Sequence, residues 1–317
     1  MTALRAAVIG VGYLGRFHAQ KYAVATGCRL VGVADSLETA RAAVAAELGT
    51  VAYADWRDLL GQVDVVSIAT PTPLHHPIAL AFLDSGAHVL VEKPITVTAA
   101  EAEELIEAAR RAGRILQVGH LERFNAAVQA LDGIITAPRF IESHRLAPFK
   151  ARGTDVSVVL DLMIHDIDLI QSIVRSPLET IDAVGSRVFS DDLDIANARL
   201  RFRSGCVANV TASRVSLKTE RKIRVFQDDA YVSADLQQKI LTVIRRGAAS
   251  GDADMPQVAI DERSYEQGDA LKAEIEAFLQ SARTGTPPLV GGAEGLAALT
   301  TATRIAALVA EGGRSDR

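Results

Sequence analysis

The length of 317 residues predicts two domains, since one domain usually spans about 150 residues. Hydrophobic residues make up 49% of the chain and charged residues 23%, which is typical of globular proteins and excludes a disordered chain. The net charge is −5, and no block of basic residues occurs. This charge pattern argues against a protein that binds nucleic acid through its phosphates.

The sequence also predicts a cytoplasmic protein. No apolar run approaches the roughly 18 residues needed to span a bilayer. The N-terminal segment reaches a glycine-rich stretch before a secretory signal could form. Two isolated cysteines, Cys28 and Cys206, form neither a CxxC pair nor a disulfide framework, so we expect a reducing compartment.

The first 120 residues alternate short apolar segments with amphipathic helical segments. One helix is expected over residues 37–48, with Gly49 as its C-cap, and another opens with a capping box of Thr98 and Glu101. This alternation predicts an N-terminal Rossmann domain, residues 1–120, with a doubly wound parallel sheet. The five expected strands span residues 6–9, 30–34, 63–69, 88–91 and 115–118.

The pattern changes after residue 120 and predicts a second, α+β domain over residues 121–317. We expect it to contain a large, open, mainly antiparallel sheet, with one face covered and the other free for a ligand or a partner subunit. The last helix is expected to pack back on the protein. The expected strands span residues 181–189, 196–202, 207–215, 222–227, 230–234 and 240–245. Helical spacing occurs at residues 121–131, 158–174, 271–279 and 295–310.

A glycine-rich loop follows the first expected strand and predicts an NAD site. Its glycines allow a tight turn, close approach of a diphosphate, and close packing of helix on strand. Asp35 lies 20 residues after the last glycine, where a carboxylate accepts hydrogen bonds from the adenosine ribose and disfavours the 2′-phosphate of NADP. The alternative is that the glycines form only a turn and that Asp35 only caps a helix. The loop residues expected to bind the cofactor are Gly10, Gly12, Tyr13, Leu14 and Gly15.

A second loop is expected beside the cofactor, because it follows the strand over residues 63–69. It contains Thr70, Pro71 and His75. Loops at the carboxyl ends of parallel strands border the ligand crevice in such sheets. A proline-stiffened turn that carries surface histidines is the alternative, and for His76 it is as good an interpretation.

Two further segments carry candidate reactive groups. Lys93, preceded by Glu92, lies at the carboxyl end of a central strand, where the nicotinamide is expected. Asp161, His165 and Asp168 share one face of an expected helix because of their spacing. A solvated lysine, a salt-bridging helix face or a metal site are the alternatives, and we expect no metal because hydride transfer to NAD needs none.

The glycine-rich loop, the Glu92-Lys93-Pro94 motif and the Asp161…His165 pair together resemble the Gfo/Idh/MocA oxidoreductases over essentially the whole chain. The segment over residues 119–125, followed by 161–169, is similar to one branch, the UDP-N-acetylglucosamine 3-dehydrogenases. The resemblance implies an enzyme that oxidises the sugar 3-hydroxyl to a ketone with NAD. A partner aminotransferase would then aminate the ketone in lipid A or related sugar biosynthesis.

The resemblance also implies roles for residues of this chain. Lys93 and His165 would converge on the reacting hydroxyl, with His165 favoured as base because histidine titrates near neutrality. Asp161 would bind a neighbouring hydroxyl or orient His165, and Glu92 would position Lys93 or bind the nicotinamide ribose. The order of proton transfer between the lysine and the histidine stays open.

A UDP-sugar also needs cationic groups at its diphosphate. Arg123 is the preferred candidate, and Asn125 lies in the same branch-like segment. Arg145, Lys150 and Arg152 are further candidates, since guanidinium groups suit phosphate oxygens, although solvated surface charges are the alternative.

Two other functions remain open at this point: an NAD-dependent dehydrogenase of a free sugar or polyol such as an inositol, and a non-catalytic NAD-sensing protein. The free sheet face leads us to expect a homodimer or homotetramer.

Overall fold

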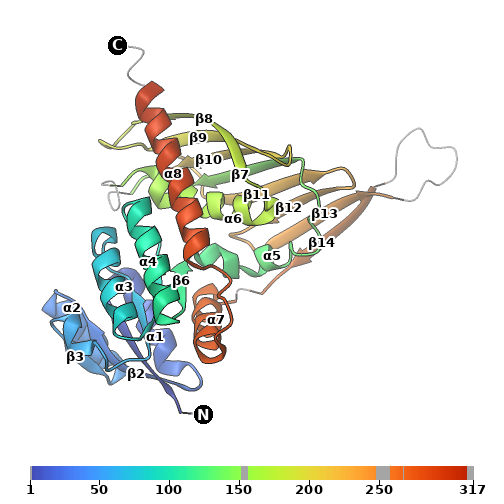
Figure 1. Cartoon of the computed structure of the whole chain (residues 1–317). Helices are drawn as coiled ribbons and strands as arrows, with labels where there is room; N and C mark the ends of the chain where they lie inside the picture. The colour runs from blue at the N-terminus through green and yellow to red at the C-terminus, as the bar shows by residue number, and fades with distance from the viewer. Residues whose placement is uncertain (1, 151–155, 248–257, 267, 313–317) are drawn as a thin grey trace, which may run out of the picture. The chain divides into compact units, whose positions relative to one another are not determined.

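The computed structural model describes residues 2–150, 156–247, 258–266 and 268–312. The chain divides into two compact units (Figure 1). Unit 1 comprises residues 1–121 and 269–299, and unit 2 comprises residues 122–268 and 300–317. The segment 269–299 differs from the prediction, which assigns it to the second domain, because its helix packs with the N-terminal residues.

Unit 1 contains a six-stranded sheet in which all neighbouring strands are parallel, which confirms the predicted Rossmann fold. The strand order is β3-β2-β1-β4-β5-β6. The central strands are almost entirely apolar because helices cover both faces of the sheet. The strands are β1 (Leu4–Ile9), β2 (Cys28–Ala34), β3 (Val51–Tyr53), β4 (Val65–Ile68), β5 (His88–Glu92) and β6 (Leu116–Gly119).

The helices of unit 1 begin and end at the expected signals. The capping box of Thr98 and Glu101 is present, and Gly49 and Gly113 end their helices in the left-handed conformation. Buried side chains of α7, among them Phe278, join the core formed by α1, α2 and one face of the sheet. These contacts explain why α7 belongs to unit 1. The helices are α1 (Tyr13–Val24), α2 (Glu38–Leu48), α3 (His75–Asp84), α4 (Ala99–Ala112) and α7 (Ala270–Thr284).

Unit 2 contains an eight-stranded sheet in the order β14-β13-β12-β11-β7-β10-β9-β8. Only the pair β7 and β10 is parallel among its neighbouring strands, so the prediction of a mainly antiparallel sheet is confirmed. The strands are β7 (Phe140–Leu146), β8 (Leu178–Ser186), β9 (Ile195–Phe202), β10 (Val207–Ser213), β11 (Glu220–Gln227), β12 (Ala230–Asp235), β13 (Ile240–Arg246) and β14 (Val258–Ser264).

Strands β7 and β14 are absent from the sequence-based prediction for different reasons. The side chains of β7 that point into the protein include Ser143 and Arg145, so the strand lacks the usual apolar alternation. Strand β14 is an edge strand and exposes nearly all of its side chains, so neither of its faces is marked as apolar.

The helices of unit 2 are more irregular than expected. The predicted helix over 121–131 is instead a 3-10 turn, Leu121–Phe124, followed by the short α5 (Ala126–Gln129). Asn125 separates them because its side chain accepts a hydrogen bond from the amide of Ala127 and so caps α5. The predicted helix over 158–174 begins as a π-helical turn, Val159–Met163, and continues as α6 (Ile164–Val174), which lies on β7 and β10 (Figure 1).

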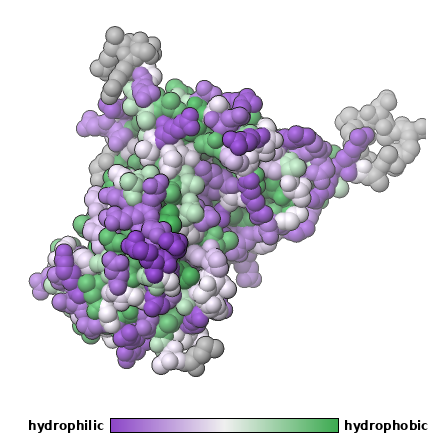
Figure 2. Space-filling model, in the orientation of Figure 1, coloured by the Kyte–Doolittle hydropathy of each residue, from purple (hydrophilic) through white to green (hydrophobic). Residues whose placement is uncertain are grey.

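The last helix, α8 (Gly292–Gly312), begins in unit 1 and ends in unit 2. It is long and apolar enough in composition to cross a membrane, but core helices have the same properties. Ala302, Ile305 and Val309 of this helix are buried, and Gln171 of α6 donates a hydrogen bond to Thr301. Hydrophilic and hydrophobic residues intermingle on the face of the protein shown in Figure 2.

Candidate functional site

The glycine-rich loop joins β1 to α1. At two of its glycines, any larger residue would clash with the backbone. A Cβ atom on Gly10, whose φ is +81°, would lie 2.8 Å from the backbone of Ala69, and one on Gly15 would lie 1.8 Å from the carbonyl oxygen of Gly10. A Cβ atom on Gly12, in contrast, would have no heavy atom of the described residues within 4 Å. No side chain caps α1 at Gly12. The loop therefore leaves space for a diphosphate at this helix N-terminus, where the positive end of the helix dipole favours an anion.

Asp35 lies directly beside this loop, at the end of β2. Its carboxylate accepts hydrogen bonds from the amides of Val11 and Leu37, both at 2.8 Å. The carboxylate therefore holds the glycine-rich loop and the start of α2 together. This position agrees with a role beside the adenosine ribose. The contact with Leu37 is a turn ahead of α2 and not the capping role of the alternative, because Leu37 is the N-cap residue and no side-chain hydrogen bond caps the helix there.

His75 connects the loops that follow β4 and β5. Its two ring nitrogens lie 2.8 Å from the carbonyl oxygens of Thr70 and Pro94, and the side chain is buried. Burial lowers the pKa of His75, and a neutral ring has a single N–H, so it donates a hydrogen bond to only one of these two carbonyl oxygens. The hydroxyl of Thr70 is buried and has no hydrogen-bond partner among the described residues, which leaves it available to a cofactor.

Glu92 points into the interior of unit 1. Its carboxylate lies 3.0 Å from Nε2 of His18, and the amide of Lys93 donates a hydrogen bond of 3.3 Å to it. The neighbouring Gly119 makes room, since a Cβ atom there would lie 2.8 Å from the carboxylate. Glu92 therefore fixes the backbone at Lys93, whose side chain is half-buried at the end of β5. These contacts favour the positioning role of Glu92 over ribose binding.

In unit 2, Asp161 lies in the π-helical turn and His165 in the first turn of α6, and both are half-buried. Asp168 is buried, and its carboxylate lies 3.9 Å from Nε of Arg123. Single π-helical turns occur often at functional sites, because they shift the side chains that follow relative to a regular helix. The part of the helix that carries Asp161 and His165 thus has an unusual local geometry.

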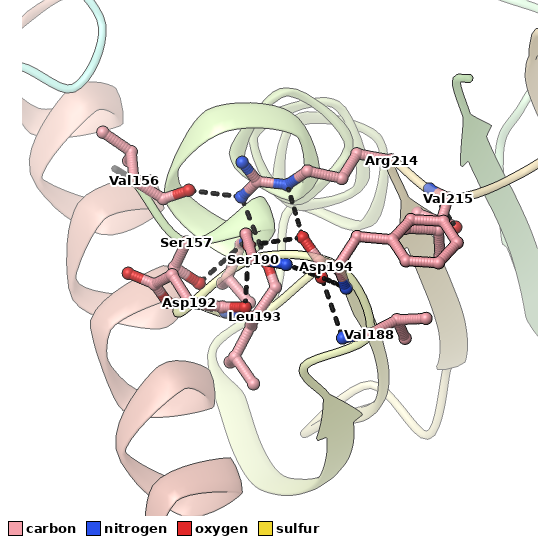
Figure 3. Close-up of polar contacts among 12 residues, drawn as sticks. Val156, Ser157, Val188, Ser190, Asp192, Leu193, Asp194, Arg214 and Val215 are labelled. Atoms are coloured by element: carbon pink, nitrogen blue, oxygen red, sulfur yellow. Dashed lines mark hydrogen bonds and ion pairs between the residues drawn. The ribbon is translucent and has the colours of Figure 1, made fainter. Parts of the chain in front are cut away.

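A buried ion pair holds the start of this helical segment (Figure 3). Arg214 donates hydrogen bonds to the carbonyl oxygens of Val156 and Leu193, and its Nε lies 3.6 Å from the carboxylate of Asp194. Burial raises the pKa of Asp194, but hydrogen bonds from the hydroxyl of Ser190 and three backbone amides outweigh burial and hold it below its ordinary value. The ionised pair therefore anchors the chain immediately before the π-helical turn.

The remaining predicted substrate residues have varied surroundings. Arg145 is buried in ion pairs with Glu122 and Asp166, so the prediction that it flanks a ligand entrance is wrong. Asn125 is also buried, and it donates a hydrogen bond to the carbonyl of Leu236 while it caps α5. Arg152 lies outside the described residues.

Sequence reasoning missed two buried side chains of unit 1, His18 and Glu274. Both lie near Glu92, and one potential ligand atom from each of the three residues lies within 4.8 Å of the others. His18 gives no local signal. Glu274 does, because it falls on the apolar face of α7 between Leu271 and Phe278, where a charged residue is unusual.

Comparisons with known proteins agree with this arrangement. The family described as "Oxidoreductase family, NAD-binding Rossmann fold" matches residues 4–120, and the "GFO/IDH/MocA C-terminal domain" matches residues 127–233. The UDP-N-acetylglucosamine 3-dehydrogenase of Acidithiobacillus ferrooxidans is 40% identical over 96% of this chain and 97% of that protein. A solved structure of that enzyme matches with a TM-score of 0.92 over 98% of both chains.

A more distant relative acts on a free polyol. The myo-inositol 2-dehydrogenase of Thermotoga maritima is 28% identical over 93% of both proteins. Two family models, in chain order, and a relative of 40% identity over nearly the whole length agree on one assignment. The chain belongs to the Gfo/Idh/MocA family of NAD-binding oxidoreductases, a family of sugar dehydrogenases.

Proposed function

We propose that this protein oxidises the 3-hydroxyl of UDP-N-acetylglucosamine to the 3-keto sugar. The observation that carries the proposal is the 40% identity, over almost the full length of both proteins, with a UDP-N-acetylglucosamine 3-dehydrogenase. In this proposal, a partner aminotransferase aminates the ketone for lipid A or a related sugar. The protein would be cytoplasmic and a homodimer or homotetramer.

The residues of the glycine-rich loop fit the cofactor. Bound NAD⁺ would supply the acceptor for the hydride that leaves the sugar carbon. The amides that follow Gly12 at the start of α1 would bind its diphosphate, Asp35 its adenosine ribose, and Thr70 a polar group beside the loop. Tyr13 and Leu14 open the helix at this position, and Pro71 shapes the turn that His75 braces.

In the proposed reaction, Lys93 and His165 act on the same sugar hydroxyl. His165 accepts the hydroxyl proton as the bond to hydrogen at the sugar carbon breaks, and Lys93 donates a hydrogen bond to the oxygen. Asp161 binds a neighbouring hydroxyl or orients His165. Arg123, Asn125 and Arg152 are the proposed substrate-binding residues, with Arg123 and Arg152 assigned to the diphosphate. The burial of Asn125 and its two structural hydrogen bonds limit it to an indirect role.

Substrate turnover tests this function directly. We expect NADH to form when the protein is incubated with NAD⁺ and UDP-N-acetylglucosamine, and not with free N-acetylglucosamine or myo-inositol. An aminotransferase that consumes the ketone should be included, because oxidation of an alcohol by NAD⁺ can be limited by its equilibrium. Turnover of myo-inositol with no turnover of any UDP-sugar would instead support the free-polyol function.

The free-polyol dehydrogenase remains the second candidate, because the relative from Thermotoga maritima carries that name and covers nearly the whole chain. The non-catalytic NAD sensor is a weaker alternative. The joint presence of Lys93, Asp161 and His165 supports catalysis, since a sensor would not require them.

The choice between the two nicotinamide cofactors depends on Asp35. We expect the protein to bind NAD⁺ much more tightly than NADP⁺, because the carboxylate would repel the 2′-phosphate. In the variant Asp35→Ser this preference should fall by at least about tenfold, measured as the ratio of the two dissociation constants. Asp55→Ser, which changes an exposed carboxylate elsewhere in unit 1, is the control. Equal affinity of the unmodified protein for both cofactors would refute the role of Asp35.

A further inference from the structure

The interior of unit 1 holds a group of polar side chains beside β5, and of these only Glu92 has a role in the proposed site. His18 and Tyr22 come from α1, Ser67 from β4 and Glu274 from α7, and all four have an exposed fraction of 0%. Glu92, at the end of β5, is 8% exposed. Five polar groups from four separate elements therefore meet in the core, away from water.

Hydrogen bonds connect four of these five groups. The ring of His18 lies 3.2 Å from the hydroxyl of Ser67 and 3.0 Å from the carboxylate of Glu92, and Ser67 lies 2.8 Å from the hydroxyl of Tyr22. Burial raises the pKa of Glu92, but the contact with His18 and the charge of Lys93 outweigh burial and hold it below its ordinary value. Glu92 therefore carries the negative charge of the group.

Glu274 is the member of the group that these bonds do not satisfy. Neither of its carboxylate oxygens has a hydrogen-bond partner among the described residues. Burial, and then the charge of Glu92, raise the pKa of Glu274 well above its ordinary value. A second ionised carboxylate in this core would have a large energetic cost, which a bound proton removes.

We propose that Glu274 and Glu92 form a buried proton-binding site next to the backbone of Lys93. In this site Glu274 is protonated, and His18 contacts the ionised carboxylate of Glu92. Two neighbouring buried carboxyl groups cannot both ionise without strong repulsion, so one of them, Glu274, keeps its proton. The titratable groups that face the site are His18 and Tyr22 from α1 and Glu92 and Lys93 from β5. Burial raises the pKa of Tyr22, so its phenol remains protonated throughout. The two carboxyl groups of the site, Glu92 and Glu274, therefore carry one negative charge and not two.

The variant Glu274→Gln tests the proposal, since glutamine keeps the shape and a hydrogen-bond donor but cannot ionise. Glu274 of the unfolded chain loses its proton near its ordinary pKa, whereas the folded protein retains the proton to higher pH. Above that ordinary value the unfolding equilibrium constant of the unmodified protein should therefore rise with pH, by up to about tenfold per pH unit. Glu274→Gln lacks this contribution. Its melting temperature should exceed that of the unmodified protein, and the difference should grow between about pH 5 and 8.

Glu276→Gln is the matched control, because it changes a half-exposed glutamate of the same helix and should follow the unmodified protein at each pH. Infrared spectroscopy gives a second measurement. At neutral pH the infrared spectrum of the unmodified protein should contain the carbonyl stretch of a protonated carboxylic acid, and Glu274→Gln should lack it. The proposal fails if that band is absent, or if Glu274→Gln and the unmodified protein have parallel pH profiles of stability.

A metal ion would give the opposite results. An ion held by His18, Glu92 and Glu274 would require an ionised Glu274, so Glu274→Gln would be destabilised at every pH. Metal analysis of the purified protein would then find about one equivalent per chain, lost in the variant. That outcome would overturn the proton site. None of these measurements depends on the sugar substrate, so they are independent of the proposed enzymatic reaction.

Discussion

Lys93→Ala and His165→Ala are each expected to lower kcat by about 10²–10⁴-fold while the affinity for NAD⁺ persists. The expectation follows from the proposed roles, since a positioned base and its hydrogen-bond partner act mainly in the transition state. The cofactor loop is separate in sequence from both residues and is held by its own hydrogen bond from Val11 to Asp35. Steady-state kinetics with UDP-N-acetylglucosamine would measure kcat, and fluorescence titration would measure NAD⁺ binding.

His76→Ala is the control for the histidine, because its ring pairs with Glu104 at the surface of α3 and α4. The control should retain the activity of the unmodified protein. Near-normal turnover in both Lys93→Ala and His165→Ala would contradict the assigned roles. Loss of NAD⁺ binding in Lys93→Ala would instead indicate that the lysine serves the cofactor.

The sequence allowed most of unit 1 to be predicted because its signals are local. Strands buried on both faces are apolar throughout, and helix ends carry capping residues such as Thr98 and Gly49. The short strand β3 was missed because three residues leave too little pattern. The membership of α7 in unit 1 was missed as well, because it depends on contacts with α1 across most of the chain.

The candidate site was predictable only in part. The glycine-rich loop and Asp35 are close in sequence, and their spacing alone predicts that they meet. The pairing of His18 with Glu92 joins residues 74 positions apart and has no sequence signature. The π-helical turn at Asp161 is likewise a product of packing, since its residues have an ordinary helical pattern.

The buried position of Arg145 shows why polar residues are difficult to assign from sequence alone. Lone arginines near an expected ligand entrance suggest phosphate binding, yet this arginine lies on the buried face of β7. Its Nε donates a hydrogen bond of 2.6 Å to Asp166, and its Nη1 one of 2.9 Å to Glu122. The hydroxyl of Ser143 donates a further bond to Asp166. The network fixes the central strand of the sheet against α6, the helix that carries His165.

Arg145→Met is therefore expected to lower the free energy of unfolding by about 3–5 kcal/mol. The variant would leave the carboxylate of Asp166 buried without its cation, and Glu122 would keep only its longer contact of 3.5 Å with Arg221. Both carboxylates are at most 9% exposed. Urea unfolding monitored by circular dichroism would measure the change. Arg139→Met is the control, because it removes an ion pair with Asp228 that is exposed to water and should change stability little.

The reason for the loss can be tested by neutralising the carboxylates. If uncompensated buried charge causes the instability, then adding Glu122→Gln and Asp166→Asn to Arg145→Met should recover a large part of the lost stability. Recovery would show that the arginine is required by its two buried partners rather than by packing of its side chain. If the triple variant is less stable than Arg145→Met alone, the hydrogen bonds of the carboxylates to other groups, such as Ser143, hold the network together, and the charge-based explanation is wrong.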